Sequence, residues 1–352
     1  MRIALDVGPL LDPPTGVGRY TGEIARGLEL HGETVMRWAV SLRGAKAEQV
    51  ARWKLPARLV RTSWRRLGVP SIERLVGAVD VVHATNFVLP ALRDTPGVVT
   101  VHDMSFLRDD VFPGGERLRD LVPWSVRRAE RVIVPTEAIA AEIGARLNVS
   151  GSRIDVTPEG VSESFFGAQP LADAALAHMG IRRPFVLAVG TLEPRKNLAR
   201  LVGAWAQVRD RLPGWSLVLA GPSGWGPGLP ETPGVRLTGW VGDETLPGLL
   251  AASELFCYPS LYEGFGLPPL EAMATGTPAL VGRYSAAPEV LGDAALLVEP
   301  TDGTALAEGL LALATDEPLR RRLSAAGKAR AASYSWSRTV TATIASYKAA
   351  LG

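Results

Sequence analysis

Cysteine and histidine are scarce in this sequence. Cys257 is its single cysteine, and its four histidines lie far apart, without the HExxH spacing of a zinc protease. A disulfide framework and every metal site that needs several cysteines are therefore excluded. The lack of cysteine pairs is typical of the reducing cytoplasm, so we expect a cytoplasmic protein.

Neither sign of charge is in clear excess, and no long apolar stretch occurs. Lys and Arg total 38 against 36 Asp and Glu, which gives a net charge of +2. A balance this near zero argues against nucleic acid as the main partner. No run of about 18 apolar residues is present, and residues 1–5 enter a strand pattern instead of a signal peptide.

The chain carries enough apolar material for two hydrophobic cores. Its 352 residues suggest two domains at roughly 150 residues each, and 47% of them are hydrophobic. Short runs rich in Val, Ile and Leu recur, each followed by a stretch of helical character, which is typical of strands buried between helices. The runs are residues 3–7, 79–83, 98–102, 132–134, 154–156, 185–189, 217–220, 235–237, 255–258, 279–281 and 295–298. They predict an α/β protein with two doubly wound, Rossmann-like domains.

Glycine and proline interrupt this pattern between residues 159 and 184. We therefore predict a first domain over residues 1–165, a second over 166–335, and a closing helix over 336–352. The helix carries one apolar stripe at helical spacing. Its members are Trp336, Val340, Ile344, Tyr347 and Leu351.

Two glycines follow the first strand, just before a helical stretch over residues 21–30. Gly16 and Gly18 let the backbone approach a ligand closely, and the following helix offers free N–H groups to an anion. The spacing is one residue too long for the GxGxxG fingerprint, which argues against a Rossmann dehydrogenase. An ordinary strand-to-helix turn that needs glycine is the alternative for this loop.

The second series of strands opens with a strand that ends in Val189 and Gly190. Arg195 and Lys196 follow closely, and together they can hold a diphosphate, Arg through its fork and Lys as a point charge. A solvated surface turn is the alternative for such a pair. Its place at the ligand-binding edge of a sheet favours the diphosphate.

The most informative stretch leads from the strand at 255–258 through a Gly-Phe-Gly loop into a helix. The first turn of that helix accepts Pro268 and Pro269, which have no N–H. The donors to an anion must then be the amides of the preceding residues. These are Gly264, Phe265, Gly266 and Leu267.

Two glutamates flank this anion pocket. Glu263 precedes the loop, and Glu271 lies in the early helix. Two carboxylates would repel a phosphate, but they suit sugar hydroxyls on either side of a diphosphate. A carboxylate favoured by the helix dipole explains Glu271 alone and leaves Glu263 without a role.

The motif Glu263-x7-Glu271, within YEGFGLPPLEAMATGTP, resembles the donor motif of retaining glycosyltransferases of family 4, which have the GT-B fold. Other matching segments fall in the family's order over nearly the whole chain, and the bacterial subgroup with O-antigen mannosyltransferases is the most similar. They are TGVGRY from residue 15, VHDMSF from 101, residues 190–198 and 221–222, GWV from 239, APEV from 287 and the helix from Trp336. The resemblance implies two Rossmann-like domains facing each other across a cleft, with the C-terminal helix crossing back to the first.

The resemblance also implies a role for each matching residue. The first domain would serve the acceptor side, and the second the nucleotide sugar. Glu271 would bind the ribose hydroxyls, Glu263 hydroxyls of the transferred sugar, and His102 a sugar hydroxyl and the backbone of the site. The diphosphate would be held, and stabilised as it leaves, by Arg195, Lys196, the amides of residues 264–267 and amides near Gly16 and Gly18. Gly190 would belong to the same donor site, and backbone near Val241 would contact the base.

The roles of residues at two positions of the predicted site allow more than one interpretation. Many family members carry Arg directly after the glycine equivalent to Gly190, where this chain has Thr191, so the division of labour between Arg195 and Lys196 stays open. A histidine at a strand end is often only a satisfied polar residue. The adjacent Asp103 and the family match favour a site role for His102. His83 has neither, so we leave it out of the predicted site.

The resemblance implies transfer of a hexose from a nucleotide diphosphate sugar to a hydroxyl of a glycan or lipid-linked glycan, with the anomeric configuration retained. Mannose from GDP-mannose is favoured. Glu263 is the nearest nucleophile for a double displacement, but the resemblance favours same-face attack, in which the departing phosphate oxygen takes the acceptor's proton. A transferase that uses a UDP- or dTDP-sugar on a soluble acceptor, and a non-catalytic nucleotide-sugar binding subunit, are the alternatives.

The sequence contains no Asp-x-Asp, by which many nucleotide-sugar enzymes hold Mg²⁺ or Mn²⁺ on the diphosphate. Cationic side chains and oriented amides must then neutralise the leaving group. We therefore expect no metal, and no cofactor beside the nucleotide-sugar donor as co-substrate.

One stretch of the first domain interleaves cations with large apolar residues. Nine basic and two acidic residues lie between Arg43 and Arg74. From Arg52 to Leu67, a basic helix with tryptophans can lie on anionic lipid at the inner face of the membrane and reach a lipid-linked acceptor. A solvated helix whose Trp and Leu side chains face the domain core is the alternative.

Overall fold

The computed structural model describes residues 1–11, 15–42, 50–108 and 115–352, and the chain divides into two compact units. Unit 1 comprises Met1–Gly160 and Trp336–Gly352, and unit 2 comprises Val161–Ser335. Residues 161–165, which the sequence pattern grouped with the first domain, pack within unit 2. The amide of Val161 donates to the carbonyl oxygen of Tyr334 at 3.2 Å, and the buried side chain of Phe165 lies in a short helix that contacts α8 (Leu246–Ala252) and α9 (Leu267–Thr275).

Unit 1 contains, among the described residues, a seven-stranded sheet in the order β3-β2-β1-β4-β5-β6-β7. All neighbouring strands are parallel. The strands are β1 (Arg2–Asp6), β2 (Thr34–Val40), β3 (Ala51–Trp53), β4 (Val81–Ala84), β5 (Gly97–Thr100), β6 (Arg131–Val134) and β7 (Ile154–Val156). The apolar runs predicted all of these except β2 and β3. Arg37 interrupts β2, and β3 is a three-residue edge strand, so neither gives a continuous apolar run.

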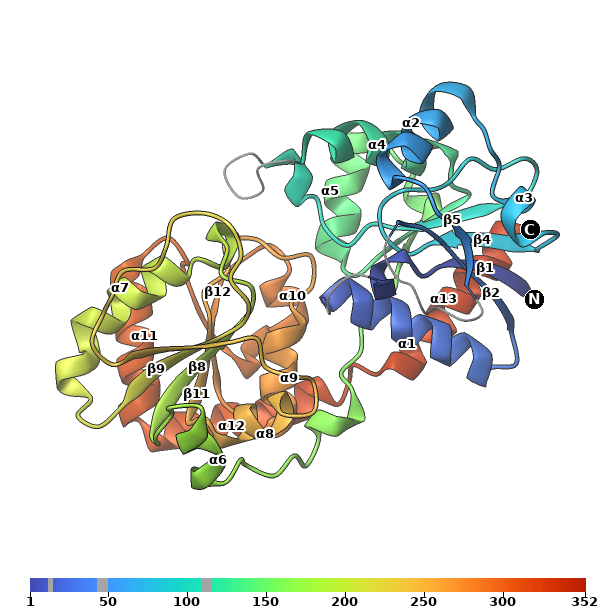
Figure 1. The fold of residues 1–352 in the computed structure, drawn as a ribbon. Coiled ribbons are helices and arrows are strands. Elements are labelled where there is room, and N and C mark those ends of the chain that lie inside the picture. The colour runs from blue at the N-terminus through green and yellow to red at the C-terminus, as the bar shows by residue number, and fades with distance from the viewer. Residues whose placement is uncertain (12–14, 43–49, 109–114) are drawn as a thin grey trace. The chain divides into compact units, whose positions relative to one another are not determined.

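Helices cover both faces of this sheet (Figure 1). α1 (Gly16–Leu30) and α13 (Trp336–Leu351) lie on one face, and α2 (Ala57–Leu67), α3 (Glu73–Val76) and α4 (Glu116–Arg128) on the other. α5 (Glu137–Leu147) packs beside β6 and β7. On the second face, a core cluster joins Trp38 of β2 to Val60 and Trp64 of α2.

α13 completes unit 1. The apolar stripe predicted this helix, and the family resemblance implied that it packs on the first domain. Trp336, Val340, Ile344 and Tyr347 are buried, whereas Leu351 at the end of the stripe is 46% exposed. The helix packs on α1 and on β4, β5 and β6. The approach to α1 is close, because a Cβ on Gly27 would lie 2.3 Å from a methyl group of Val340.

Unit 2 contains, within its described residues, a six-stranded parallel sheet in the order β10-β9-β8-β11-β12-β13. Its strands, all predicted, are β8 (Phe185–Val189), β9 (Ser216–Ala220), β10 (Val235–Gly239), β11 (Leu255–Tyr258), β12 (Ala279–Gly282) and β13 (Leu296–Val298). α7 (Leu198–Val208) and α11 (Gly303–Thr315) pack on one face, and α8, α9 and α10 (Ala287–Leu291) lie on the other (Figure 1). α6 (Asp173–His178) precedes β8, and α12 (Glu317–Ala331) packs on α9.

The two sheets reverse their strand order at equivalent places. In unit 1 the chain runs outward from β1 to β3 and then restarts on the other side of β1 with β4. In unit 2 the same reversal separates β8 from β11. Ligands of open parallel sheets bind at such a switch point, at the carboxyl ends of the strands. The loops after β8 and β11 are therefore the place to look for a site in unit 2.

His83 shows what holds α13 on the sheet. Its fully buried ring places Nδ1 2.7 Å from the Tyr347 hydroxyl of α13 and Nε2 2.8 Å from the Thr100 hydroxyl of β5. Burial lowers the pKa of His83 to about 3. Both nitrogens are thus used inside unit 1, which agrees with leaving His83 out of the predicted site.

The neutral state of His83 predicts a loss of stability in mild acid. Below a pKa of about 6.5 the unfolded chain binds a proton that the native ring, with its pKa near 3, does not bind. The free energy of unfolding therefore falls as the pH falls from 6.5 towards 3, by about 2 kcal/mol at pH 5. We expect His83→Gln to be less stable than the wild type at pH 7, but to lose about 2 kcal/mol less between pH 7 and pH 5 in urea unfolding. The same loss in both proteins would contradict this account.

Candidate active site

The loops that follow β8 and β11 are joined at the switch point of unit 2. The backbone amide of Leu261 donates to the carbonyl oxygen of Arg195 at 2.9 Å. Asn197, at the end of the first loop, is buried and donates from its side-chain amide to the carbonyl oxygens of Pro259 and Pro300 at 3.1 and 2.6 Å. These hydrogen bonds fix the predicted cations against the predicted glutamate.

Glu263 is the centre of this junction. Its Oε2 accepts a hydrogen bond from Nη1 of Arg195 at 2.5 Å, and its Oε1 accepts one from Nζ of Lys196 at 2.7 Å. The Tyr258 hydroxyl, at the end of β11, donates to the same Oε1 at 2.9 Å. The structure thus brings together three of the predicted residues, which are separated by 67 or 68 positions in the chain.

A second carboxylate, Glu193, completes the cluster. Its Oε1 accepts from Nε and Nη2 of Arg195 at 3.1 and 2.9 Å, while Nη1 of Arg195 also donates to the carbonyl oxygen of Tyr262 at 3.2 Å. Two cations therefore face two carboxylates, and their formal charges cancel. Lys196 is held as well, because its Nζ also donates to the Tyr258 hydroxyl at 2.6 Å.

Burial and charge act in opposite directions on this cluster. Burial alone would raise the pKa of Glu263, but the charges of Arg195 and Lys196 outweigh it and lower the pKa to about 2. Burial lowers the pKa of the Lys196 ammonium and raises that of the Tyr258 hydroxyl. Both oxygens of Glu263 thus face cations or hydroxyl donors, and the carboxylate fixes the two cations in place.

The Gly-Phe-Gly loop caps α9. Gly266 is the N-cap residue, with a φ of 98°, and a Cβ there would lie 2.1 Å from the Tyr284 hydroxyl, so only glycine is compatible with this turn. Pro268 and Pro269 lie in the first turn, as predicted. The amide of Leu267, the first residue of the helix, has no partner within the helix, because the first N–H groups of any helix lack one.

The remaining predicted donor residues of unit 2 are placed as follows. Glu271 lies one turn into α9 and is buried. Gly190 directly follows β8, and Val241 lies two residues beyond the end of β10, at the same carboxyl edge of the sheet. Their contacts to a nucleotide sugar stay predictions.

The glycines of unit 1 differ from the prediction. α1 begins at Gly16, with Thr15 as its N-cap, so Gly16 and Gly18 belong to the first turn of the helix and not to a loop before it. The amide of Gly18 donates to Oγ1 of Thr15 at 3.1 Å. The Thr15 hydroxyl thus already accepts from one of the amides assigned to an anion. Threonine before a Gly-Val-Gly stretch is a cap signal, and it accounts for the earlier start.

His102 follows β5 in unit 1 and is buried, with Nε2 2.8 Å from the carbonyl oxygen of Thr85. Its second nitrogen, Nδ1, lies 3.5 Å from Oε1 of Glu159. The role of His102 towards a sugar hydroxyl stays a prediction. Glu159, Glu193 and Tyr258 were missed from the sequence, because no spacing rule links them to the residues they contact.

The basic helix α2 presents a different surface from the one predicted. Trp64 is buried in the core and Trp53 packs against it, so the tryptophans do not face solvent. Leu55, Leu59 and Leu67 are exposed instead, beside Arg58 and a group of other cations. Residues 43–49 of the basic segment lie outside the described residues.

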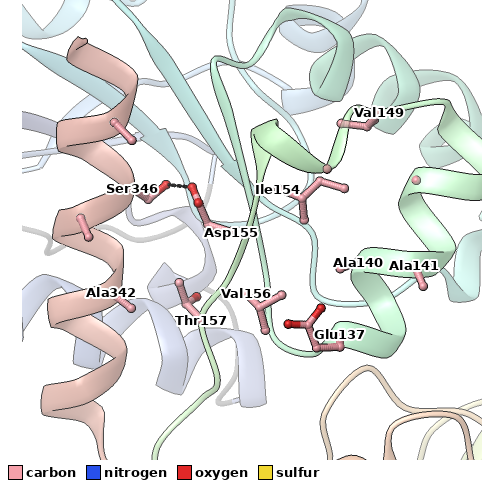
Figure 2. Close-up of a pocket in the computed structure, with 14 residues that line it drawn as sticks. Glu137, Ala140, Ala141, Val149, Ile154, Asp155, Val156, Thr157, Ala342 and Ser346 are labelled. Atoms are coloured by element: carbon pink, nitrogen blue, oxygen red, sulfur yellow. Dashed lines mark hydrogen bonds between the residues drawn. The ribbon is translucent and has the colours of Figure 1, made fainter.

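A groove of about 870 Å³ lies along β7, between α5 and α13 (Figure 2). Small side chains such as Ala140 and Ala342 line its two sides, and Asp155 accepts a hydrogen bond from Ser346 at 2.6 Å beside it. None of the predicted site residues lines this groove. It belongs to the lateral edge of the sheet in unit 1.

No three His, Cys, Asp or Glu side chains in the described part of the chain are grouped so that they could hold a metal ion. No helix in the described ranges is both long and apolar enough to cross a membrane.

Comparison with known proteins connects these features to one family. The model for glycosyltransferase family 4 matches residues 14–165, and that for glycosyl transferases group 1 matches residues 180–330. The O-antigen chain mannosyltransferase B of Escherichia coli is 33% identical over 289 residues, which cover 76% of this chain and 74% of that protein. The chain belongs to glycosyltransferase family 4.

The names of two other relatives of this family 4 glycosyltransferase refer to acceptors other than an O-antigen chain. The MMP alpha-(1->4)-mannosyltransferase of Mycolicibacterium hassiacum is 34% identical over 64% of this chain and 55% of its own length. The D-inositol 3-phosphate glycosyltransferase of Mycolicibacterium smegmatis is 32% identical over 78% of this chain and 68% of its own.

Solved structures place the glycosyltransferase in the GT-B fold. Sucrose-phosphate synthase from Thermosynechococcus elongatus matches 99% of this chain and 98% of its own with a TM-score of 0.81 and 21% identity. WaaG, a glycosyltransferase of lipopolysaccharide biosynthesis, matches 97% and 98% with a TM-score of 0.73 and 18% identity. HepE from Anabaena, solved with UDP-glucose, matches 98% of both chains with a TM-score of 0.74 and 19% identity.

Proposed function

We propose that this enzyme transfers mannose from GDP-mannose to a hydroxyl of a glycan or a lipid-linked glycan, with retention of the anomeric configuration. The observation that carries the proposal is the 33% identity to an O-antigen mannosyltransferase over three quarters of both chains. The neutral cluster of Glu193, Arg195, Lys196 and Glu263 supports it, since the cluster lies at the carboxyl edge of the sheet, where open parallel sheets generally bind their ligands.

Leaving-group stabilisation is the main task of this site in our proposal. A diphosphate that reaches Lys196 competes with Glu263 for the ammonium group, and the amides at the start of α9 donate to the same anion. Glu263 keeps its bond to Arg195, while the oxygen that Lys196 releases turns towards the sugar hydroxyls in this proposal. The acceptor attacks from the face of the departing phosphate, whose oxygen takes the proton.

A second candidate is a transferase that acts on a soluble acceptor with another nucleotide sugar. The relationship to a D-inositol 3-phosphate glycosyltransferase at 32% identity favours it. A non-catalytic binding subunit is the third reading, and hydrolysis of a nucleotide sugar by the purified chain would exclude it.

The nucleotide is the property that separates the first two candidates. A ligand that binds only the native state raises the melting temperature, so thermal unfolding reports binding directly. We expect GDP and GDP-mannose to raise the melting temperature, and UDP, dTDP and their sugars to leave it unchanged at equal concentration. A shift with UDP- or dTDP-sugars alone would replace the first candidate by the second.

The cation cluster predicts large effects on turnover. Each lost contact to the leaving group should cost roughly 2–4 kcal/mol of barrier. We expect Lys196→Ala, Arg195→Ala and Glu263→Ala each to lower kcat by more than about a hundredfold. Arg182→Ala, an exposed cation of the same unit, is the matched control and should leave kcat unchanged. Near-normal turnover in all three site variants would refute the site.

We further propose that the reaction needs no metal ion. Cations and amides supply the positive charge on the diphosphate in this proposal, so no divalent ion is required. We expect turnover to be the same after treatment with EDTA as before it. A reproducible loss that Mn²⁺ or Mg²⁺ restores would contradict metal independence.

The exposed face of α2 is the proposed contact with the inner face of the membrane. Its leucines can insert between lipids while its arginines contact anionic head groups. We expect the chain to float with anionic vesicles and not with neutral ones, and the double variant Leu59→Gln, Leu67→Gln to float less. Leu351→Gln, which changes an exposed leucine of α13, is the control. Equal absence from both kinds of vesicle would reject the contact.

A further inference from the structure

Ser260 carries a buried hydroxyl that the fold of unit 2 does not use. The residue lies two positions beyond the end of β11, in the loop that leads to Glu263, and it is fully buried. Its Oγ has no hydrogen-bond partner among the described residues. Such a hydroxyl has given up its hydrogen bonds to water without a replacement, which destabilises the native state. A buried unpaired group beside a candidate site therefore calls for a contact that the unliganded structure does not show.

The backbone of Ser260 is held in place on two sides. A Cβ on Gly282, at the end of β12, would lie 2.8 Å from the carbonyl oxygen of Ser260, so the two segments pack directly against each other. The next residue, Leu261, donates its amide to the carbonyl oxygen of Arg195 at 2.9 Å. Ser260 can therefore reach a new acceptor by rotation of its side chain and without movement of the loop.

Glu263 is an acceptor beside this hydroxyl. Burial would raise the pKa of Glu263, the charges of Arg195 and Lys196 lower it, and the Ser260 hydroxyl adds to the lowering. The hydroxyl is thus close to the carboxylate, but without the distance and angle of a hydrogen bond. A carboxylate has about four acceptor positions. The donors of Arg195, Lys196 and Tyr258 occupy three of them, which leaves one for a further donor.

A diphosphate changes the partners of Glu263. In the proposed function it competes with Glu263 for the ammonium group of Lys196, which donates to Oε1 at 2.7 Å. Without that donor, the contacts of the carboxylate described above are reduced to Arg195 on Oε2 and the Tyr258 hydroxyl on Oε1. A buried carboxylate that loses a cationic partner is less well compensated. A neighbouring hydroxyl that can donate to it then stabilises the site more than before.

We propose that Ser260 is a positioning residue whose hydroxyl bonds to Glu263 when a diphosphate draws Lys196 away, so that the carboxylate stays in place to accept a sugar hydroxyl. Arg195, Tyr258, Ser260 and the sugar hydroxyl then supply one donor for each acceptor position. The role rests on the proposed function, which brings a diphosphate to Lys196. All the residues involved belong to unit 2.

Thermal unfolding of the unliganded full-length chain tests this exchange of partners. Lys196→Met removes the ammonium group and keeps most of the apolar stem. We expect Ser260→Ala alone to leave the melting temperature unchanged or to raise it, because it removes an unpaired buried hydroxyl. In the Lys196→Met background the hydroxyl has a partner, so the same change should lower the melting temperature. Equal shifts in the two backgrounds, or a lower melting temperature in Ser260→Ala alone, would overturn the proposal.

Binding of GDP, measured by calorimetry, tests the role in the site and does not depend on the folding of Lys196→Met. We expect Ser260→Ala to raise the Kd for GDP about tenfold, which is typical of a lost hydrogen bond to a charged group. Ser260→Thr keeps the hydroxyl and should raise the Kd less. Ser216→Ala is the matched control and should leave the Kd unchanged, because Oγ of Ser216, at the start of β9, is also buried and unpaired among the described residues.

The two measurements separate a failure of this inference from a failure of the proposed function. A wild type that does not bind GDP contradicts the proposed donor, while the melting temperatures still decide whether Ser260 replaces Lys196. A wild type that binds GDP no more tightly than Ser260→Ala does leaves the proposed donor intact and overturns the role of Ser260. A purely structural serine would lower the melting temperature in both backgrounds and would leave the Kd of the folded chain unchanged.

Discussion

The buried ion pairs of Glu263 with Arg195 and Lys196 are the constraint on which the site of unit 2 depends. Charges taken out of water are costly, and removing one partner of a buried pair leaves the other uncompensated, typically at a cost of about 3–5 kcal/mol. Glu263 therefore keeps two cations inside the protein and joins the loop after β8 to the loop after β11. Because the strands that carry these loops are neighbours at the switch point, the ion pairs also fix the start of α9.

Much of the fold could be predicted, because buried parallel strands leave a plain signal in the sequence. Every strand of unit 2 appears as an apolar run, since helices cover both faces of that sheet. β2 was not predicted because Arg37 interrupts its apolar residues. β3 was not predicted because a three-residue edge strand is too short to show an apolar run. The start of α1 was misplaced because glycine suggests a loop, although Thr15 is a good cap.

The site was predictable only where a local motif carries it. The spacing of Glu263 and Glu271 marks that segment as a candidate donor motif. The position of Lys196 shortly after a strand marks it as a candidate ligand for a diphosphate. What Lys196 and Glu263 do to each other depends on a contact across 67 positions, and no local pattern encodes it. The same holds for Glu159, which the sequence marks only as the start of a break between domains.

The position of α13 has a consequence for the order in which the chain acquires structure during synthesis. This helix covers β4, β5 and β6 of unit 1, yet every residue of unit 2 precedes it in the chain. A ribosome that has completed β7 has therefore produced a sheet with one face still incomplete, and His83 still lacks the hydroxyl of Tyr347. Unit 2 is contiguous and can fold as soon as it emerges. The first half of the protein to be made is thus the last to be finished.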